Sequence, residues 1–211
     1  MQGVPRYVLL LVAACAACHA SGAVTGKPGD RLAVDRLYPL RQGSVWTYDV
    51  DTGDGNPPTL AITRVTARDG ALAEVSSGAA PIRYALRADG LYRDDRRAYV
   101  LKGPVKKGAR WDVGQGAIAE VVEDDKRVST PAGDFTGCVE VRETGGPSPK
   151  VVRTVFCPDV GPVEVESSMG LGITGATAGR SARVLARLGG YDFAPAAEAA
   201  AAPVEKVEQR R

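Results

Sequence analysis

Asp51-Thr52-Gly53 is the first of several short motifs whose residue types could perform chemistry. It matches the triplet of aspartic proteases, in which two such aspartates share one proton. The chain has a single copy, and Asp54 follows it where those enzymes carry a small residue. The loop from Asp51 to Asn56 is acidic enough to suggest calcium, but no acidic residue closes the twelve-residue spacing of an EF-hand. We therefore expect a solvated hairpin tip.

A second motif, Gly170 to Gly175, reads GxGxxG. Dinucleotide binding would need a following helix and an acidic residue about 20 positions further on, within a parallel sheet. The chain instead runs into a segment rich in Ala and Pro, so we expect a loop before the last strand.

Paired carboxylates for acid–base catalysis are offered by Glu123-Asp124-Asp125 and by Asp94-Asp95. A carboxylate-dependent hydrolase would need two acidic side chains converging in one cleft. Because no partner base, nucleophile or metal motif accompanies them, we interpret these residues as turn and edge charges. The hydrolase is kept as an alternative, and we assign no catalytic residue, metal ligand or cofactor.

Histidine is absent from the chain except for His19, although it is the commonest acid–base group and transition-metal ligand. The 27 basic and 25 acidic residues nearly cancel, which gives no electrostatic reason to expect nucleic acid as a partner. The composition therefore favours a non-enzymatic protein.

The N-terminus carries Arg6, a short apolar run over residues 7–14, and then Cys15 behind Val12-Ala13-Ala14. This pattern is typical of an export signal, and it looks like a bacterial lipobox, in which the cysteine becomes the lipid-bearing first residue. Cys18 is a weaker acceptor, and plain secretion with cleavage after Ala23 is the alternative. Ala16 follows the cysteine where an acidic residue would signal retention in the inner membrane. We therefore predict a lipid-anchored protein of the bacterial envelope, at the outer membrane.

Cys138 and Cys157 are expected to form a disulfide, because exported proteins fold in an oxidising compartment. Strand-like sequences flank a turn-like segment at 144–149, and a hairpin centred between Pro147 and Ser148 places the two cysteines opposite each other. That register also places Arg142 opposite Arg153, which is unfavourable, so a slip by one residue stays open. Two free thiols are the alternative.

Four segments divide the chain: a signal peptide at 1–14, a flexible lipidated tether at 15–36, a folded domain at 37–193 and a disordered Ala/Pro-rich tail at 194–211. Within the domain, short runs rich in β-branched and aromatic residues alternate with turn signals such as Asp69-Gly70 and Asp89-Gly90. Residues 182–188 are interpreted as a strand with Arg183 and Arg187 outward. We predict an all-β domain, a single antiparallel meander forming a curved sheet, half-barrel or sandwich.

Two tryptophans follow similar turns, Pro39 to Trp46 and Pro104 to Trp111. In each, proline and glycine shape a turn and the tryptophan enters a strand as a large core anchor. A second interpretation is that Trp46 and Trp111 line a site for an apolar ligand.

Three stretches together resemble a loose set of bacterial envelope lipoproteins of unassigned activity. They carry the patterns PLxxGxxWxY from Pro39, TPAGxFxxC from Thr130 and PxVGxV from Pro158. The resemblance implies a single all-β domain and no particular reaction. Taken with the residues above, it predicts a membrane-anchored binding or accessory module whose partner is an apolar ligand or another envelope protein. A structural module that contacts peptidoglycan or an outer-membrane protein is a further alternative.

Overall fold

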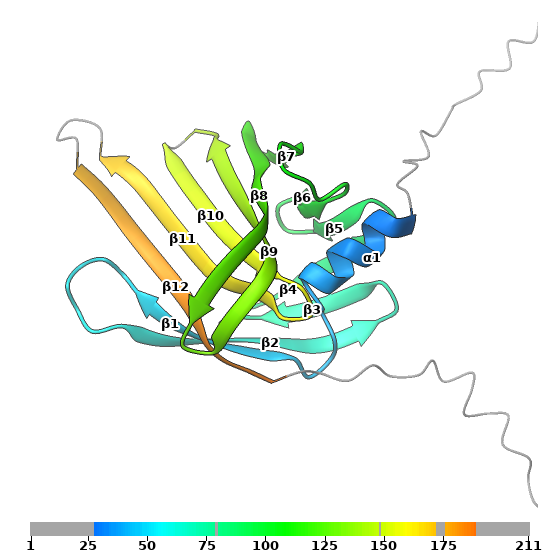
Figure 1. Cartoon of the computed structure of the whole chain (residues 1–211), viewed down its shortest axis with the longest axis horizontal. Coiled ribbons are helices and arrows are strands. Elements are labelled where there is room, and N and C mark those ends of the chain that lie inside the picture. Colours follow the sequence, from blue (N-terminus) through cyan, green and yellow to red (C-terminus); the bar gives the residue numbers. More distant parts are fainter. Residues whose placement is uncertain (1–27, 79, 148, 172–175, 189–211) are drawn as a thin grey trace, which may run out of the picture.

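One sheet of twelve antiparallel strands makes up almost all of the described part of the computed structural model, in which a single helix packs against the sheet (Figure 1). The structure describes residues 28–78, 80–147, 149–171 and 176–188. The helix is α1 (Pro28–Leu37). The strands are β1 (Val45–Asp51), β2 (Thr59–Asp69), β3 (Leu72–Ser76), β4 (Pro81–Arg87), β5 (Gly90–Arg93), β6 (Ala98–Lys102), β7 (Arg110–Gly114), β8 (Ala117–Thr130), β9 (Gly133–Gly145), β10 (Lys150–Cys157), β11 (Gly161–Leu171) and β12 (Ala176–Leu188). No helix in these ranges is both long and apolar enough to span a membrane.

The strands follow one another through the sheet as two meanders, β1 to β6 and β7 to β12, joined where β1 pairs with β12. The predicted antiparallel meander is confirmed. The two end strands, β6 and β7, come together without a ladder of backbone hydrogen bonds, and the Nε1–H of Trp111 donates to the carbonyl of Tyr99 at 3.1 Å. The sheet is therefore barrel-like, with a seam between β6 and β7.

The β9–β10 hairpin has the register that the turn at 144–149 predicts. Val139 pairs with Phe156 and Arg142 with Arg153, and the disulfide joins Cys138 to Cys157. The cost of two facing arginines is offset by carboxylates on the same outer surface. Arg153 lies 2.8 Å from Glu166 and 3.5 Å from Glu140. These neighbours favour the observed register over a slip by one residue.

The helix α1 corrects the predicted tether, which was placed over residues 15–36. The chain becomes helical at Pro28, a residue favoured in the first turn because it has no N–H to leave unpaired. Val34 and Leu37 are buried, and Tyr38 and Leu40 follow them into the core. Because α1 contacts β4, β5, β6, β10 and β11, it ties the two meanders together at one end of the sheet. Residues 1–27 and 189–211, with the predicted signal, lipid acceptor and tail, lie outside the described residues.

The β8–β9 hairpin is the longest in the sheet, and it bends away from its neighbours. Three register shifts interrupt the β8–β9 pairing between Val121 and Val128. The tip reaches β12, where the N–H of Ala132 donates to Val184 at 3.3 Å and Arg183 donates to the carbonyl of Ser129. Figure 1 shows this hairpin running across the sheet toward β12. The disulfide lies near the bend, and both of its cysteines are buried.

Candidate functional site

Trp46 and Trp111, predicted either as core anchors or as ligand-lining residues, are core anchors in this structure. Trp46 is fully buried and donates its Nε1–H to the carbonyl of Val160 at 2.7 Å. Trp111 is also buried, and its indole bridges the seam to Tyr99. Neither ring lines the two cavities of about 420 and 310 Å³ in the sheet, so a ligand site at these rings stays a prediction.

The Asp-Thr-Gly motif forms the loop between β1 and β2. Asp51 accepts the N–H of Gly53 at 2.7 Å, and Asp54 accepts the Thr52 hydroxyl at 2.8 Å and the N–H of Asn56 at 3.0 Å. These bonds, the Thr52 hydroxyl first, lower the pKa of Asp54. The loop satisfies its own polar groups, as a hairpin tip does.

The GxGxxG motif begins in β11, and the next described element is strand β12. Residues 172–175 lie outside the described residues. The strand stands where dinucleotide binding would require a helix, which removes the structural context of that motif.

The acidic pairs do not converge on one another. Asp124 accepts the N–H of Lys107 at 3.0 Å, and Glu123 lies 3.9 Å from Lys126. Asp95 makes a two-pronged ion pair with Arg93, with both oxygens 2.7 Å from guanidinium nitrogens. Arg93 is the main reason that the pKa of Asp95 is lowered. No group of three His, Cys, Asp or Glu suited to a metal occurs in the described ranges.

The feature most suited to binding is the inside of the barrel-like sheet, a cavity of about 420 Å³ that we call the lumen. Its size falls within the range of small-molecule sites. Residues from both meanders line it, together with Tyr38 after α1. They are Tyr38, Tyr48, Val50, Ala61, Thr63, Val75, Ser77, Ile82, Tyr84, Arg93, Arg96, Lys150, Val152, Pro162, Val165, Ser167, Arg180 and Ala182.

The wall formed by β9 to β12 changes from apolar to charged in successive rows. Strand pairing places Pro162, Phe156 and Val139 in one row across the inner face. The next row lies two residues further along β9 and β10 and three residues further along β11, where the register shifts, and it runs Ala182, Val165, Thr154 and Val141. The row after that runs Arg180, Ser167, Val152 and Glu143, and Lys150 lies one row beyond. Since two residues span about 6.6 Å of strand, Lys150 lies about 20 Å along β10 from Phe156.

Three tyrosines form the inner part of the lumen. The ring centroid of Tyr38 lies 5.9 Å from that of Tyr84, and the Tyr48 hydroxyl donates to the carbonyl of Pro162 at 2.9 Å. Burial is the main cause that raises the pKa of Tyr38 and of Tyr48, and the neighbouring Tyr84 phenol adds to both. Burial also raises the pKa of Tyr84, against the opposing charge of Arg93. All three are neutral hydroxyls at physiological pH and do not act as bases.

Because the pKa values of these tyrosines are raised, we expect the free energy of unfolding to decrease in alkali. In the unfolded chain their phenols ionise near pH 10, whereas in the folded chain they hold their protons to higher pH. Above about pH 10 the folded state therefore binds more protons, and the free energy of unfolding falls by up to about 1.4 kcal/mol per pH unit for each such tyrosine. Urea denaturation at steps between pH 8 and 11 measures this slope. Tyr48→Phe should make it shallower, and stability constant to pH 11 would contradict the prediction.

Four cations and no carboxylate line the lumen within the described part of the chain. Two are partnered from outside it, Arg93 by Asp95 and Arg96 by Glu143 at 3.6 Å. The other two, Lys150 and Arg180, are exposed, and neither side chain has an ion-pair or hydrogen-bond partner among the described residues. The lumen therefore carries a surplus of positive charge on its charged rows.

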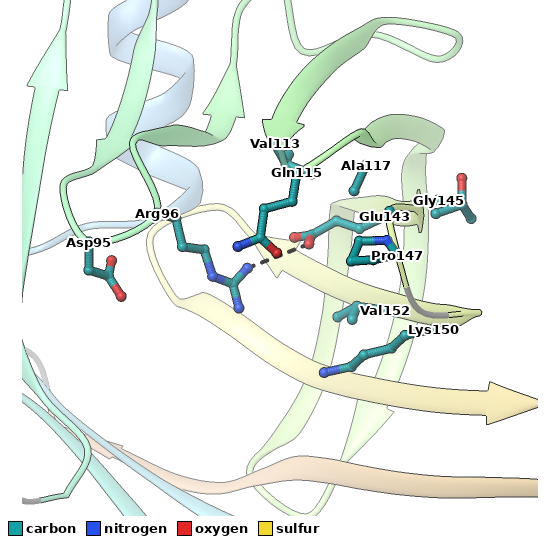
Figure 2. A pocket seen from close by; sticks show the side chains of 13 residues that line it. Asp95, Arg96, Val113, Gln115, Ala117, Glu143, Gly145, Pro147, Lys150 and Val152 are labelled. Atoms are coloured by element: carbon teal, nitrogen blue, oxygen red, sulfur yellow. Dashed lines mark ion pairs between the residues drawn. The ribbon is translucent and has the colours of Figure 1, made fainter.

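A second cavity of about 310 Å³ adjoins the lumen and shares Arg96, Lys150 and Val152 with it. It lies between the β5–β6 turn, the end of β7 and the β9–β10 turn. Figure 2 shows Arg96 directed at Glu143, with Gln115 beside that ion pair and Lys150 near Val152. The charged side of the lumen therefore opens into a polar space rather than into packed core.

Sequence reasoning missed the lumen residues, although part of the signal was present. Alternation in β1 and β12 places Tyr48, Val50 and Ala182 on one face. What the alternation lacks is the closure of the sheet, which turns that face toward the inside of the barrel-like sheet. The closure depends on the pairing of β1 with β12 and on the approach of β6 to β7, and the β1–β12 pairing joins residues far apart in sequence.

No protein-family model matches this chain, and no curated protein matches it. Among solved structures, it is similar to a Bacteroides fragilis protein described as exported and of YmcC-like fold. The TM-score is 0.49 at 14% identity, over 72% of this chain and 98% of that chain. It is also similar to a Parabacteroides distasonis protein described as a lipoprotein, with a TM-score of 0.41 at 13% identity and the same coverages. No function is assigned from either likeness.

Proposed function

We propose that this protein is a non-enzymatic lipoprotein of the bacterial envelope that binds a ligand with an apolar part in its lumen. The observation that carries the binding function is the lumen itself, an open cavity with aliphatic walls and neutral tyrosines. Binding pockets for small molecules are mostly apolar, with a few polar groups that fix orientation. The lumen has this composition.

The envelope location is supported by two independent features. The run that ends in Val12-Ala13-Ala14-Cys15 has the form of a lipoprotein signal, and Ala16 favours the outer membrane. The disulfide between Cys138 and Cys157 suits an oxidising compartment outside the cytosol. Several acyl chains on one cysteine would make release from the membrane slow, since each buried methylene contributes about 0.8 kcal/mol.

A hydrolase that uses carboxylates has less support. Asp95 and Glu143 both line the smaller cavity, but each is held by an arginine. Because Arg93 lowers the pKa of Asp95, that carboxyl is ionised at neutral pH and cannot donate a proton there.

The anchor is tested by mass spectrometry of the mature protein isolated from envelope membranes. We expect Cys15 as the first residue, carrying diacylglyceryl and N-acyl groups, and we expect Cys15→Ser to abolish the lipid-modified form. A mature chain that begins beyond residue 18 without modification would overturn the anchor.

Binding in the lumen is tested with N-phenylnaphthylamine, a neutral dye that fluoresces in apolar surroundings. Ala182 lines the lumen, and Ala182→Phe should fill it and reduce dye binding at least about tenfold. Ser181→Phe adds a larger group at the adjacent residue on the opposite face, so it is the matched control. If both variants bind the dye equally well and circular dichroism shows both to be folded, the lumen is not the binding site.

A further inference from the structure

We infer that the ligand of the lumen is a single-chain amphiphile with an anionic head, a carboxylate or a phosphate, held by Lys150 and Arg180. This inference rests on the proposed function and adds the chemical class of the ligand. Three observations support it: the direction of the polarity gradient, the charge of the outer rows, and the two cations that have no partner among the described residues.

The gradient sets the orientation of the ligand. The inner rows of the wall offer Pro162, Val165 and Ala182, whereas the outer rows offer Ser167, Arg180 and Lys150. Transfer of an apolar tail from water to the inner rows is favourable, whereas burial of a charged head without partners is unfavourable. The head therefore lies on the charged rows, with the tail directed toward Tyr38.

The charge of the outer rows selects the sign of the head. Lys150 and Arg180 come from β10 and β12, the two strands that flank Ser167 of β11. The carboxylate in the row of Arg180 is Glu143, which lies beyond Val152 on β9 and pairs with Arg96. Asp51 pairs with Ser181 and shares that residue's outward face. An anion between Lys150 and Arg180 would thus meet two cations and a hydroxyl. Hydrogen bonds that involve charged partners are about twice as strong as those between neutral groups.

Arg96 adds a third cation with a different role. Its ion pair with Glu143 is long, at 3.6 Å, and the arginine side chain is half exposed. Arg96 lines both cavities, so an anionic head on the charged rows can replace Glu143 as the partner of Arg96. Arg93, by contrast, is held by two short contacts to Asp95 and is not available in this way.

The test compares decanoate, decanol and inorganic phosphate by titration calorimetry. The protein is the mature chain with Cys15→Ser and its disulfide intact. We expect decanoate to bind at least about tenfold more tightly than decanol, and inorganic phosphate to bind far more weakly than decanoate. Added salt should weaken the binding of decanoate and leave that of decanol unchanged.

Two sets of variants distinguish the contribution of the charged head to the affinity from that of the apolar tail. Lys150→Gln combined with Arg180→Gln should reduce decanoate affinity at least about tenfold and leave decanol unaffected. Arg64→Gln combined with Lys106→Gln is the matched control, because it removes two exposed cations that do not line the lumen.

The outcomes distinguish the two proposals. Equal affinities for decanoate and decanol in the unsubstituted protein would overturn the anionic head and leave the lumen function standing. Phosphate binding as tight as that of decanoate would overturn insertion of the tail. Absence of binding by both amphiphiles would overturn the proposed function as well.

Discussion

Replacement of Trp46 by alanine should lower the free energy of unfolding by about 4 kcal/mol. The side chain is fully buried, and its ring lies 5.8 Å from that of Tyr38. The backbone of Gly161 packs so closely that a β-carbon there would lie 3.1 Å from Nε1 of the indole. Truncation leaves a cavity among these groups and removes the hydrogen bond to Val160. Because small domains are stable by only about 5–15 kcal/mol, the variant should lie near the limit of folding.

Urea denaturation followed by circular dichroism measures this loss. Leu60→Ala is the matched control, since Leu60 lies on the neighbouring strand β2 and is 65% exposed. We expect the control to change the free energy of unfolding by less than about 0.5 kcal/mol. A similar small effect for Trp46→Ala would show that the indole is not the anchor of the core.

Removal of the disulfide should produce the second large effect, a loss of about 3 kcal/mol. The bridge joins residues 19 positions apart, so it restricts a substantial loop of the unfolded chain. We expect the variant with Cys138→Ala and Cys157→Ala to show this loss in urea denaturation.

The reduced wild-type protein should unfold at the same urea concentration as the double variant. Dithiothreitol should not change the variant further, which separates the bridge from other effects of the reductant. An unchanged midpoint after verified reduction would contradict the stabilising role of the bridge.

The sequence predicts local features of this fold well. Alternation of side chains and the turn at 144–149 are enough to set the β9–β10 register and the disulfide, because both depend on residues close in the chain. The facing pair of Arg142 and Arg153 argued against that register. Its compensation comes from Glu140 on β9 and from Glu166 on β11, and the second of these belongs to the next hairpin, which the β9–β10 pattern alone does not place.

Features that depend on distant contacts could not be predicted in the same way. The helix α1 is short, and its burial depends on contacts with strands of both meanders. The lumen requires the pairing of β1 with β12 and the approach of β6 to β7. The sequence leaves two interpretations of Trp46 and Trp111, because large aromatic rings occur both in hydrophobic cores and in binding sites, and the packing around the ring distinguishes the two.

The burial of the disulfide has a consequence for how the chain matures. Both sulfurs belong to residues with at most 1% of their surface exposed, yet thiol–disulfide exchange requires direct contact between sulfur atoms. An oxidoreductase cannot touch Cys138 or Cys157 in the finished molecule. The bridge therefore forms while this part of the sheet is open, either before the sheet closes or during a transient opening.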